Sequence, residues 1–418
     1  MIILIPIFSD AFLHPLHKDN GLSLLYVRSV GDREGKMICI NHPDCSDKES
    51  IDEIKNDHTS FYITPDKKKL MHIFPDTRLI DVNYLHWWDK NLPMDLENIR
   101  INAYDFFHSK YYNVNKLNEI IPFTKHKEYC DELFDKITEY VSECHESEYH
   151  SDITKAFGSI EKNGVKVSDD VCNIFDERVR KHVSNGKLYS QYNLWTSTGR
   201  PSNAFGTVNF AALPPEKRRA IIPENDSLVE YDFDAYHLRL IGELVDYKFD
   251  EESVHQHLAD FYGSTYEESK QISFKLLYGG ITKDIREKVP FFDKVQNYIN
   301  LKWSEFNGNN SILTNIYNRK IVFSDSSEIN RNKVFNYLIQ AFETERNIKR
   351  ILKIQNYLRD KETKLVLYGY DSFLFDFSKQ DGVETLTEIK YILEKDNYPT
   401  KIKMGYIYNM MDDITIRL

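Results

Sequence analysis

Residues 227–239 read SLVEYDFDAYHLR, an apolar stretch in which acidic side chains occupy alternate positions. In an extended strand, alternate side chains point to the same face of the sheet, so Glu230, Asp232 and Asp234 would project together. For each acid alone, a turn cap or a pair with lysine is the better interpretation. The stretch therefore predicts a strand with a row of carboxylates. The role of these carboxylates depends on the residues that lie beside the strand.

A further acid stands in a strongly apolar run near the end of the chain. Residues 364–377 form two strand-like segments that meet at Asp371. A carboxylate among apolar residues is costly unless it is paired or binds a metal ion. Two acids at the ends or bends of neighbouring strands form a divalent-metal site, because Mg²⁺ takes few carboxylates and shares its other ligand positions with substrate phosphates. Asp232 and Asp371 are therefore candidate metal ligands, although each acid alone is better explained as a turn cap or as the partner of a lysine.

Residues 266–279 are predicted to form a helix with a functional face. Lys270, Phe274 and Tyr278 are spaced by four and would lie along one stripe. A cation and two rings on an exposed stripe suit a nucleoside triphosphate, with the ammonium on phosphate and the rings against base and sugar. A core helix would use the same aromatic residues and would let the Lys270 stem reach water.

Residues 198–213 read TGRPSNAFGTVNFAAL and combine glycine with polar side chains. Arg200 and the amide side chains of this segment suit contacts with phosphate or with a nucleic-acid minor groove. Taken alone, the segment is better explained as a plain polar loop. Its meaning depends on the motifs that follow it.

The composition, with 41% hydrophobic and 28% charged residues in a chain of 418, excludes a wholly disordered protein and allows two to four domains. Strands are expected at 22–28 and 36–40, a solvated charge run at 66–69, and helices over about 113–183. The apolar opening is too short to span a membrane and lacks a basic flank, so a soluble, cytoplasmic protein is expected. Five scattered cysteines without a CxxC pair predict reduced thiols.

Taken in order, these motifs resemble the family A DNA polymerases, the group of bacterial DNA polymerase I, and look most like its compact phage-encoded members. The resemblance covers about residues 155–418. Residues 198–200 match the family's TGR motif, 231–239 its motif A, 270–279 its motif B helix and 370–372 its motif C. Three single residues match further positions of the nucleotide and DNA sites, namely His255, Asn336 and Gln340.

The resemblance implies an α/β (α+β) fold in the right-hand arrangement, with the palm at 196–244 and 331–418, the fingers at 245–330 and a helical connector or short thumb at 106–195. It implies an enzyme that extends a primer 3′-end on a template with deoxynucleoside triphosphates, by two-metal nucleotidyl transfer. Two Mg²⁺ ions, for which Mn²⁺ can substitute, would be held by Asp232, Asp371 and the carbonyl of Phe233. The implied partners are primer–template DNA, the triphosphates and replisome proteins, for a monomer in a host cytoplasm.

The same resemblance assigns roles to the remaining residues. The incoming nucleotide would contact His255, Lys270, Phe274, Tyr278 and His237, with Lys270 as the catalytic cation. Primer and template would be followed along the minor groove by Arg200, Asn209, Asn336 and Gln340. Cations at 217–219, 346, 349–350 and 353 would line a basic groove, although the net charge of the chain is −11.

Some positions depart from the family's pattern. His237 stands where motif A has a glutamate against the sugar, which leaves open an enzyme that also accepts ribonucleotides in a primase-like role. Ser372 stands where motif C ends in an acid, and Tyr266 stands where an arginine usually precedes the helix lysine by four. These losses keep a second alternative open, a catalytically inactive polymerase fold that serves as a nucleic-acid-binding replication scaffold.

Residues 1–105 are expected to form an α/β domain that resembles a degenerate 3′–5′ exonuclease domain, so no proofreading is expected. The Asp-x-Glu pairs at 32–34, 47–49 and 95–97 fall in turns or polar stretches rather than inside an apolar strand. Cys144, His145 and His150 lack a fourth ligand at a supportive spacing, and they are expected at a solvated helix end rather than around zinc.

Overall fold

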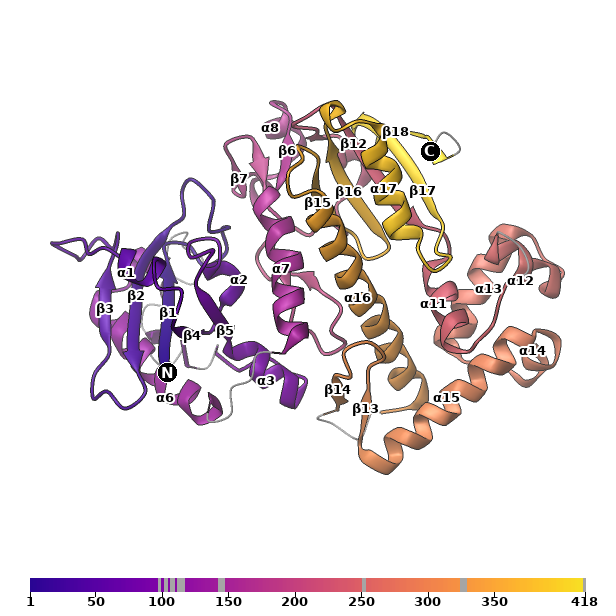
Figure 1. Ribbon diagram of the computed structural model, residues 1–418, viewed down its shortest axis with the longest axis horizontal. Helices are drawn as coiled ribbons and strands as arrows, with labels where there is room; N and C mark the ends of the chain where they lie inside the picture. Colours follow the sequence, from indigo (N-terminus) through magenta and orange to yellow (C-terminus); the bar gives the residue numbers. More distant parts are fainter. Residues whose placement is uncertain are drawn as a thin grey trace. The chain divides into compact units, whose positions relative to one another are not determined.

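The structure is a computed structural model, and it describes residues 1–96, 99–100, 104–105, 110, 117–141, 147–249, 253–323 and 329–415 (Figure 1). The chain divides into two compact units. The N-terminal unit comprises residues 1–195, 202–224 and 407–409, and the C-terminal unit comprises residues 196–201, 225–406 and 410–418. Among the described residues, no helix is both long and apolar enough to cross a membrane.

The N-terminal unit contains a five-stranded mixed sheet in the order β3-β2-β1-β4-β5. β1 pairs antiparallel with β2 and parallel with β4, and β5 continues the parallel half. The strands expected at 22–28 and 36–40 are confirmed as β2 and β3. The strands are β1 (Ile2–Phe8), β2 (Leu22–Ser29), β3 (Lys36–Cys39), β4 (Phe61–Thr64) and β5 (Arg78–Asp81).

Helical segments supply the apolar partners of this sheet on both of its faces. Ile3 and Ile5 of β1 belong to a buried cluster with residues of α3 (Val82–Lys90) and α6 (Phe123–Tyr140). Leu4 lies in a second cluster with Leu70 of α2 (Lys67–Leu70) and with Phe74. Successive residues of β1 therefore alternate between two cores, as the two-residue period of a strand requires.

Short elements complete the N-terminal unit. A second sheet has the order β11-β6-β8-β7, and β9 pairs with β10. The helices are α1 (Asp52–Lys55), α5 (Leu117–Ile120), α7 (Glu148–Asn163), α8 (Val171–Ile174), α9 (Glu177–Arg180) and α10 (Pro215–Arg218). The strands are β6 (Val165–Val167), β7 (Val183–Ser184), β8 (Lys187–Leu188), β9 (Tyr192–Asn193), β10 (Ser202–Asn203) and β11 (Ile221–Ile222).

The prediction of a solvated charge run at 66–69 is wrong for Lys68. This segment forms α2, whose first turn is capped by the Asp66 side chain. Lys68 is buried, and its ammonium lies 2.5 Å from the carboxylate of Glu161, which is 1% exposed. A partner 93 residues away along the chain compensates the buried charge, and local composition cannot indicate such a partner.

The prediction of a solvated helix end around 144–150 is wrong for His150. This residue lies in the first turn of α7 and is fully buried. Its Nε2 accepts a hydrogen bond from the Asp81 N–H at 3.3 Å, and its ring stacks on Tyr84. Cys144 and His145 lie outside the described residues.

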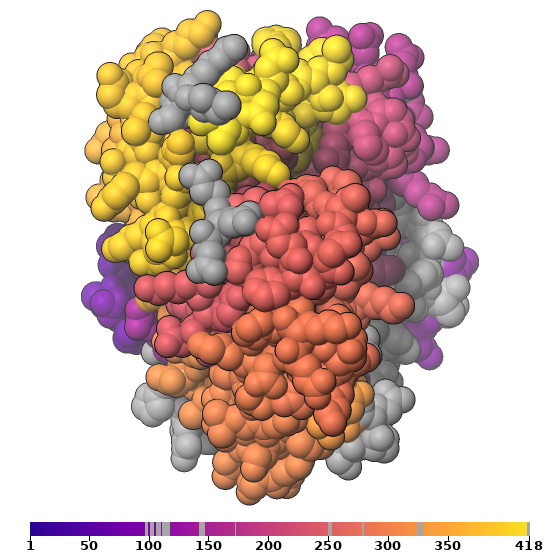
Figure 2. Space-filling model, turned by 90° about the vertical axis from the view of Figure 1, so that its right-hand side faces the viewer, coloured from indigo at the N-terminus to yellow at the C-terminus, as the bar shows by residue number. Residues whose placement is uncertain are grey.

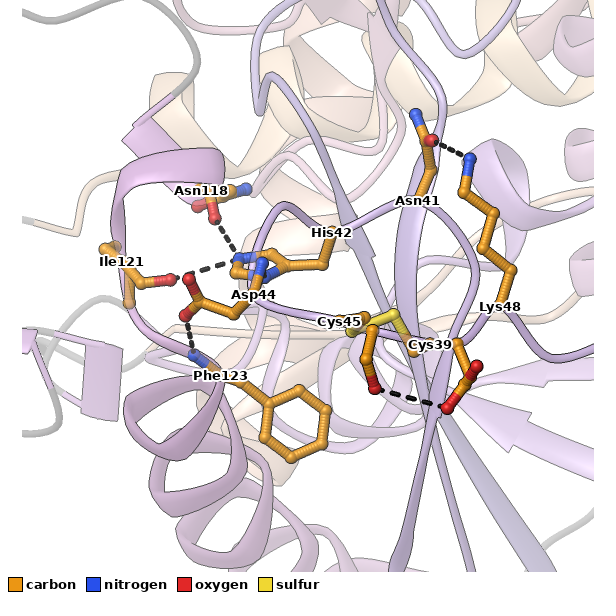
Figure 3. The surroundings of a disulfide bond; sticks show 11 residues. Cys39, Asn41, His42, Asp44, Cys45, Lys48, Asn118, Ile121 and Phe123 are labelled. Carbon is orange, nitrogen blue, oxygen red and sulfur yellow. Dashed lines mark hydrogen bonds between the residues drawn. A yellow bond between two sulfur atoms is a disulfide. The ribbon is translucent and has the colours of Figure 1, made fainter.

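The prediction of reduced thiols is wrong for Cys39 and Cys45, which form a disulfide (Figure 3). The chain turns back after β3 and brings their Cα atoms to 6.3 Å. The loop between them is held from outside: His42 contacts the carbonyl oxygens of residues 118 and 121, and Asp44 accepts a hydrogen bond from the Phe123 N–H (Figure 3). Cys130 is a buried free thiol.

The C-terminal unit contains a five-stranded sheet in the order β15-β16-β12-β17-β18. β12 is central and pairs antiparallel with β16 on one side and with β17 on the other. Tyr231 on β12 donates a hydrogen bond to the carbonyl of Leu386 on α17, which packs this helix on the sheet. The strands are β12 (Ser227–Phe233), β15 (Lys364–Tyr368), β16 (Ser372–Phe377), β17 (Thr400–Ile407) and β18 (Met410–Asp413).

The helices of the C-terminal unit share an apolar cluster to which α11, α12, α13, α15 and α16 contribute. Figure 2 shows α12–α15 in coral and orange on one face of the molecule. A hairpin of β13 (Ser311–Leu313) and β14 (Lys320–Val322) leads to the long α16. The helices are α11 (Tyr236–Leu244), α12 (Val254–Tyr262), α13 (Tyr266–Gly279), α14 (Lys283–Lys288), α15 (Pro290–Asn309), α16 (Arg331–Tyr357) and α17 (Val383–Glu394).

Candidate active site

Neighbouring strands bring the two predicted metal ligands together. Asp232 is the penultimate residue of β12, and Asp371 directly precedes β16. Asp232 pairs with Ser372 in the ladder, and the Phe233 N–H donates to the Asp371 carbonyl oxygen at 2.9 Å. Two residues 139 positions apart are therefore held side by side by backbone pairing.

The electrostatics of Asp232 are those of a crowded anionic site. Burial raises the pKa of Asp232 to about 6, the charges of Asp371 and Glu230 add to the rise, and Lys403 and Lys401 oppose it. The pKa of Asp371 is also raised by loss of hydrating water, although this residue is exposed at the surface. Carboxylates that are costly to ionise next to each other gain from a bound divalent cation, so this pair suits a metal ion.

The third acid of the row, Asp234, is already compensated. Its carboxylate lies 3.1 Å from the Lys401 ammonium and 3.5 Å from the Arg239 guanidinium. Arg239 also donates through Nε to the Asp234 carbonyl oxygen at 2.9 Å. Asp234 is thus compensated by two cations, and one of them, Lys401, also opposes the rise in the pKa of Asp232.

The turn that carries Asp371 is tight and unusual. Gly369 N–H donates to the Ser372 carbonyl at 2.8 Å, and Tyr370 has φ 72°, a conformation that bulky residues rarely adopt. Asn347 of α16 donates to the Tyr370 carbonyl at 2.8 Å. The guanidinium of Arg200 lies over the Tyr370 ring at 3.9 Å. The turn is therefore held from two sides at the point where the acid projects.

Arg200 reaches this turn from the segment 196–201. Gly199 has φ 78°, a conformation that favours glycine, and Arg319 donates to the carbonyl of Thr198 at 3.0 Å. The Arg200 Nε lies 3.0 Å from a carboxylate oxygen of Glu343, and the other oxygen lies 3.3 Å from the Nε2 of His237. One buried acid on α16 thus contacts both basic side chains.

Helix α13 has the bounds that the sequence predicted. The Lys270 ammonium lies over the ring of Tyr266 at 4.5 Å, and His255 packs edge-to-face on the same ring. Burial lowers the pKa of His255; Asp234 opposes this change, while Lys270 and Lys401 reinforce it. Phe274 is 48% exposed, as a stacking surface would be. The side chain of Tyr278 is not among those described.

The structure also brings together three residues predicted to contact nucleotide or DNA. His237, Asn336 and Gln340 line one small pocket between α11, α13 and α16. Asn209 belongs to the N-terminal unit, where it is exposed and its side-chain oxygen accepts the N–H of Ala212 at 3.1 Å.

The prediction that the cations of α16 line a basic groove is wrong for two residues. Arg350 is buried and donates to the hydroxyl of Tyr236 at 2.7 Å. Arg346 pairs with Glu243 and with Asp396. These side chains are used to hold the fold, and periodicity along α16 would have shown that they share faces with buried residues.

Sequence reasoning missed Glu343. Its side chain is fully buried, yet it contacts two of the predicted site residues. Asn336, Gln340 and Glu343 follow one another at four and three residues, so the helical period alone places them on one face.

The N-terminal unit offers one cluster with metal-binding residue types. Ligand atoms of His14, His72 and Glu161 lie within 4.8 Å of one another. Glu161, however, already binds the ammonium of Lys68, and the Nδ1 of His14 accepts the Leu16 N–H at 3.1 Å, which leaves the hydrogen of a neutral ring on Nε2. Burial lowers the pKa of His14 far below its usual value, and His72 and Lys68 add to this effect. We interpret the cluster as a buried ion pair with packed histidines.

The Asp-x-Glu pairs of this unit lie away from its sheet core. Asp32 follows β2 in an exposed turn, Asp47 and Glu49 lie in an exposed loop, and Asp95 is exposed. Glu97 lies outside the described residues. β1, the central strand, contains no acid.

No family model matches the chain, and no curated protein matches its sequence. Among solved structures, the chain is similar to the POL domain of Pol1 from M. smegmatis, determined in complex with DNA primer-template and dNTP. The two share 12% sequence identity with a TM-score of 0.66, over 98% of this chain and 95% of that chain. The chain therefore has the mixed α/β fold of a polymerase domain, as its sequence predicted.

Proposed function

We propose that this protein is a template-directed DNA polymerase that extends a primer 3′-end with deoxynucleoside triphosphates by two-metal nucleotidyl transfer. We place it in family A as a compact, phage-type member without proofreading activity. The observation that carries the proposal is the meeting of Asp232 and Asp371 on adjacent strands, in a fold similar to that of a polymerase domain bound to primer-template and dNTP.

In the proposed mechanism, Asp232, Asp371 and the carbonyl of Phe233 hold two Mg²⁺ ions, which would lower the pKa of the primer hydroxyl and offset charge on the phosphates. The raised pKa values of both acids fit this role, because ionised carboxylates in this position gain a strong counter-charge. Mn²⁺ would substitute for Mg²⁺, since both prefer oxygen ligands. Lys270 neutralises charge that develops on the leaving phosphates.

The nucleotide site lies between β12 and α13 in this proposal. His255 and Lys270 contact the triphosphate, Phe274 and Tyr278 pack against the base and sugar, and His237 faces the sugar. The DNA is followed along its minor groove, where hydrogen-bond acceptors are similar for every base pair. The residues proposed for this contact are Arg200, Asn209, Asn336 and Gln340. The palm comprises 196–244 and 331–418, the fingers 245–330 and the thumb or connector 106–195.

The test is extension of a labelled primer on a template with Mg²⁺ and deoxynucleotides. We expect extension by wild type and losses of several orders of magnitude for Asp232→Ala and Asp371→Ala. Asp412→Ala removes an exposed acid from β18 of the same sheet and is the matched control, which should retain wild-type activity. Primer–template binding without extension by wild type would instead support an inactive scaffold.

A second candidate keeps the chemistry and relaxes the choice of sugar. The imidazole of His237 stands at the proposed sugar contact and is paired with Glu343 rather than presenting a carboxylate of its own. Parallel assays with ribonucleotides separate the two candidates. Comparable rates with both sugars would favour the ribonucleotide-tolerant enzyme.

The absence of proofreading has its own test. Wild-type protein and Mg²⁺ are incubated with single-stranded DNA labelled at its 5′-end, without nucleotides. No shortening is expected, because β1 carries no acid that could hold a metal ion. A ladder of shortened products that persists in Asp232→Ala would contradict this part of the proposal.

A further inference from the structure

Glu343 is an acid that the fold buries completely and surrounds with specific partners. It lies on α16 and is 0% exposed. One carboxylate oxygen lies 3.0 Å from the Arg200 Nε, and the other lies 3.3 Å from the His237 Nε2 and 3.5 Å from an Arg200 terminal nitrogen. Burial of an ionised carboxylate destabilises the fold unless cationic groups compensate its charge. The side chains of Arg200 and His237 provide this compensation for Glu343.

The two partners reach Glu343 from different parts of the C-terminal unit. Arg200 comes from the segment 196–201 and His237 from the first turn of α11. Each remains partly open to solvent, with 27% of the Arg200 side chain and 17% of the His237 side chain exposed. Glu343 therefore contacts the buried part of the Arg200 guanidinium and of the His237 imidazole, while the exposed part of each group is accessible to a ligand.

The cluster lies next to the turn that carries Asp371. The Arg200 guanidinium is held between Glu343 and the ring of Tyr370, the residue before Asp371. Glu343, His237 and Arg200 all affect the electrostatics of Asp371. A movement of the Arg200 or the His237 side chain would thus change the electrostatic environment of Asp371.

We propose that Glu343 is a positioning residue that fixes Arg200 against the minor groove of the primer–template and His237 against the sugar of the incoming nucleotide. This inference rests on the proposed polymerase function for the roles of those two residues. Glu343 itself touches no substrate, and its effect passes through its partners. Loss of its charge releases two donors at once, and a misplacement of about 1 Å can lower a catalytic rate by about 100-fold.

Glu345 provides a matched control on the same helix. It is also buried, but it accepts the N–H groups of Ile316 and Tyr317 at 3.0 and 3.3 Å and contacts neither Arg200 nor His237 in the contacts described. Glu343→Gln and Glu345→Gln both remove a buried charge from α16 without a change in side-chain size. Stability measurements on both variants separate a structural loss from a functional one.

The experiment is a cycle of Glu343→Gln with the double variant Arg200→Ala, His237→Ala. We expect Glu343→Gln to lower kcat/KM for deoxynucleotide addition by about 100-fold in wild type and by less than about 3-fold in the double variant. The ratio of deoxynucleotide to ribonucleotide efficiency should change in Glu343→Gln as it does in His237→Ala. Glu345→Gln should leave this ratio unchanged. Equal losses in both backgrounds, with an unchanged ratio, would overturn the inference.

Primer–template binding in metal-free buffer tests the role of Glu343 independently of nucleotide addition. We expect Glu343→Gln to weaken binding in wild type and to have no effect once Arg200 is alanine. Absence of extension by wild type would refute the proposed function alone, because this binding cycle would still decide the role of Glu343. Additive losses of affinity in the two backgrounds would overturn that role even in an active polymerase.

Discussion

Replacement of Asp232 by asparagine should make the metal-free protein more stable while it abolishes primer extension. Burial and the charges of Asp371 and Glu230 disfavour the ionised carboxylate in the folded state and raise the pKa of Asp232 to about 6. In the unfolded chain the same carboxyl has a pKa of about 3.9. The folded state therefore bears a cost that asparagine, which is neutral and of similar size, does not have.

The size of this cost follows from the two pKa values. A difference of about two pH units corresponds to about 3 kcal/mol at 1.36 kcal/mol per unit. Because the side chain is partly in contact with solvent, which screens the charges, we expect about 1–2 kcal/mol. A raised carboxyl pKa destabilises the fold fully above the folded value and not at all below the unfolded value. The advantage of Asp232→Asn should therefore be complete at pH 8 and fall below half by about pH 4.5.

The assay is urea unfolding of both proteins in EDTA at these two pH values, alongside primer extension with Mg²⁺. Asp234→Asn is the matched control, because its carboxylate is paired with Lys401 and Arg239, and this variant should gain no stability. Saturating Mg²⁺ should stabilise wild type but not Asp232→Asn. The reasoning is refuted if Asp232→Asn is less stable than wild type at pH 8, or if its advantage does not change with pH.

Three further outcomes are expected. The double variant Cys39→Ser, Cys45→Ser should lose about 2 kcal/mol of unfolding free energy, because the disulfide no longer closes a loop with a sequence separation of 6 in the unfolded chain. Dithiothreitol should destabilise wild type by the same amount and should leave the stability of the variant unchanged. Glu161→Gln should cost about 3–5 kcal/mol in urea unfolding, because it leaves the ammonium of Lys68 buried without its counter-charge. In Asp232→Asn, which lacks the proposed metal site of the C-terminal unit, added Zn²⁺ should not raise the melting temperature, whereas a saturable rise would show that His14 and His72 bind metal. Primer–template affinity should fall steeply between 50 and 200 mM salt on a log–log plot, as expected for a site that displaces counterions from several phosphates; a flat response would contradict the proposed DNA contacts.

Local pattern was sufficient for the elements that carry the site. The alternation in residues 227–234 defines β12, and the spacing of Lys270 and Phe274 accompanies a helix whose bounds agree with α13. These predictions succeed because period and capping act within a few residues of chain. The Thr265 side chain and Glu268 form a capping box, a purely local device that begins α13.

The failures have one physical cause in common, which is a partner that is remote in sequence. Lys68 is buried because Glu161 compensates it, and Arg350 is buried because Tyr236 accepts its hydrogen bond. The disulfide of Cys39 and Cys45 depends on a turn after β3 that is anchored by residues near position 120. The residue type shows that a lysine or arginine can be exposed or paired, and that a cysteine can be a free thiol or part of a disulfide. The neighbouring residues in the folded structure determine which of these states occurs.

Glu343 lies between these two cases. Its place beside Asn336 and Gln340 follows from the helical period, whereas its burial and its two basic partners follow only from the packing of α16 against the segment 196–201 and α11. A residue on a functional face that is also fully buried can act on substrate only through its neighbours. The sequence could therefore have marked Glu343 as part of the site, and the structure was needed to assign it a positioning role rather than a contact with DNA.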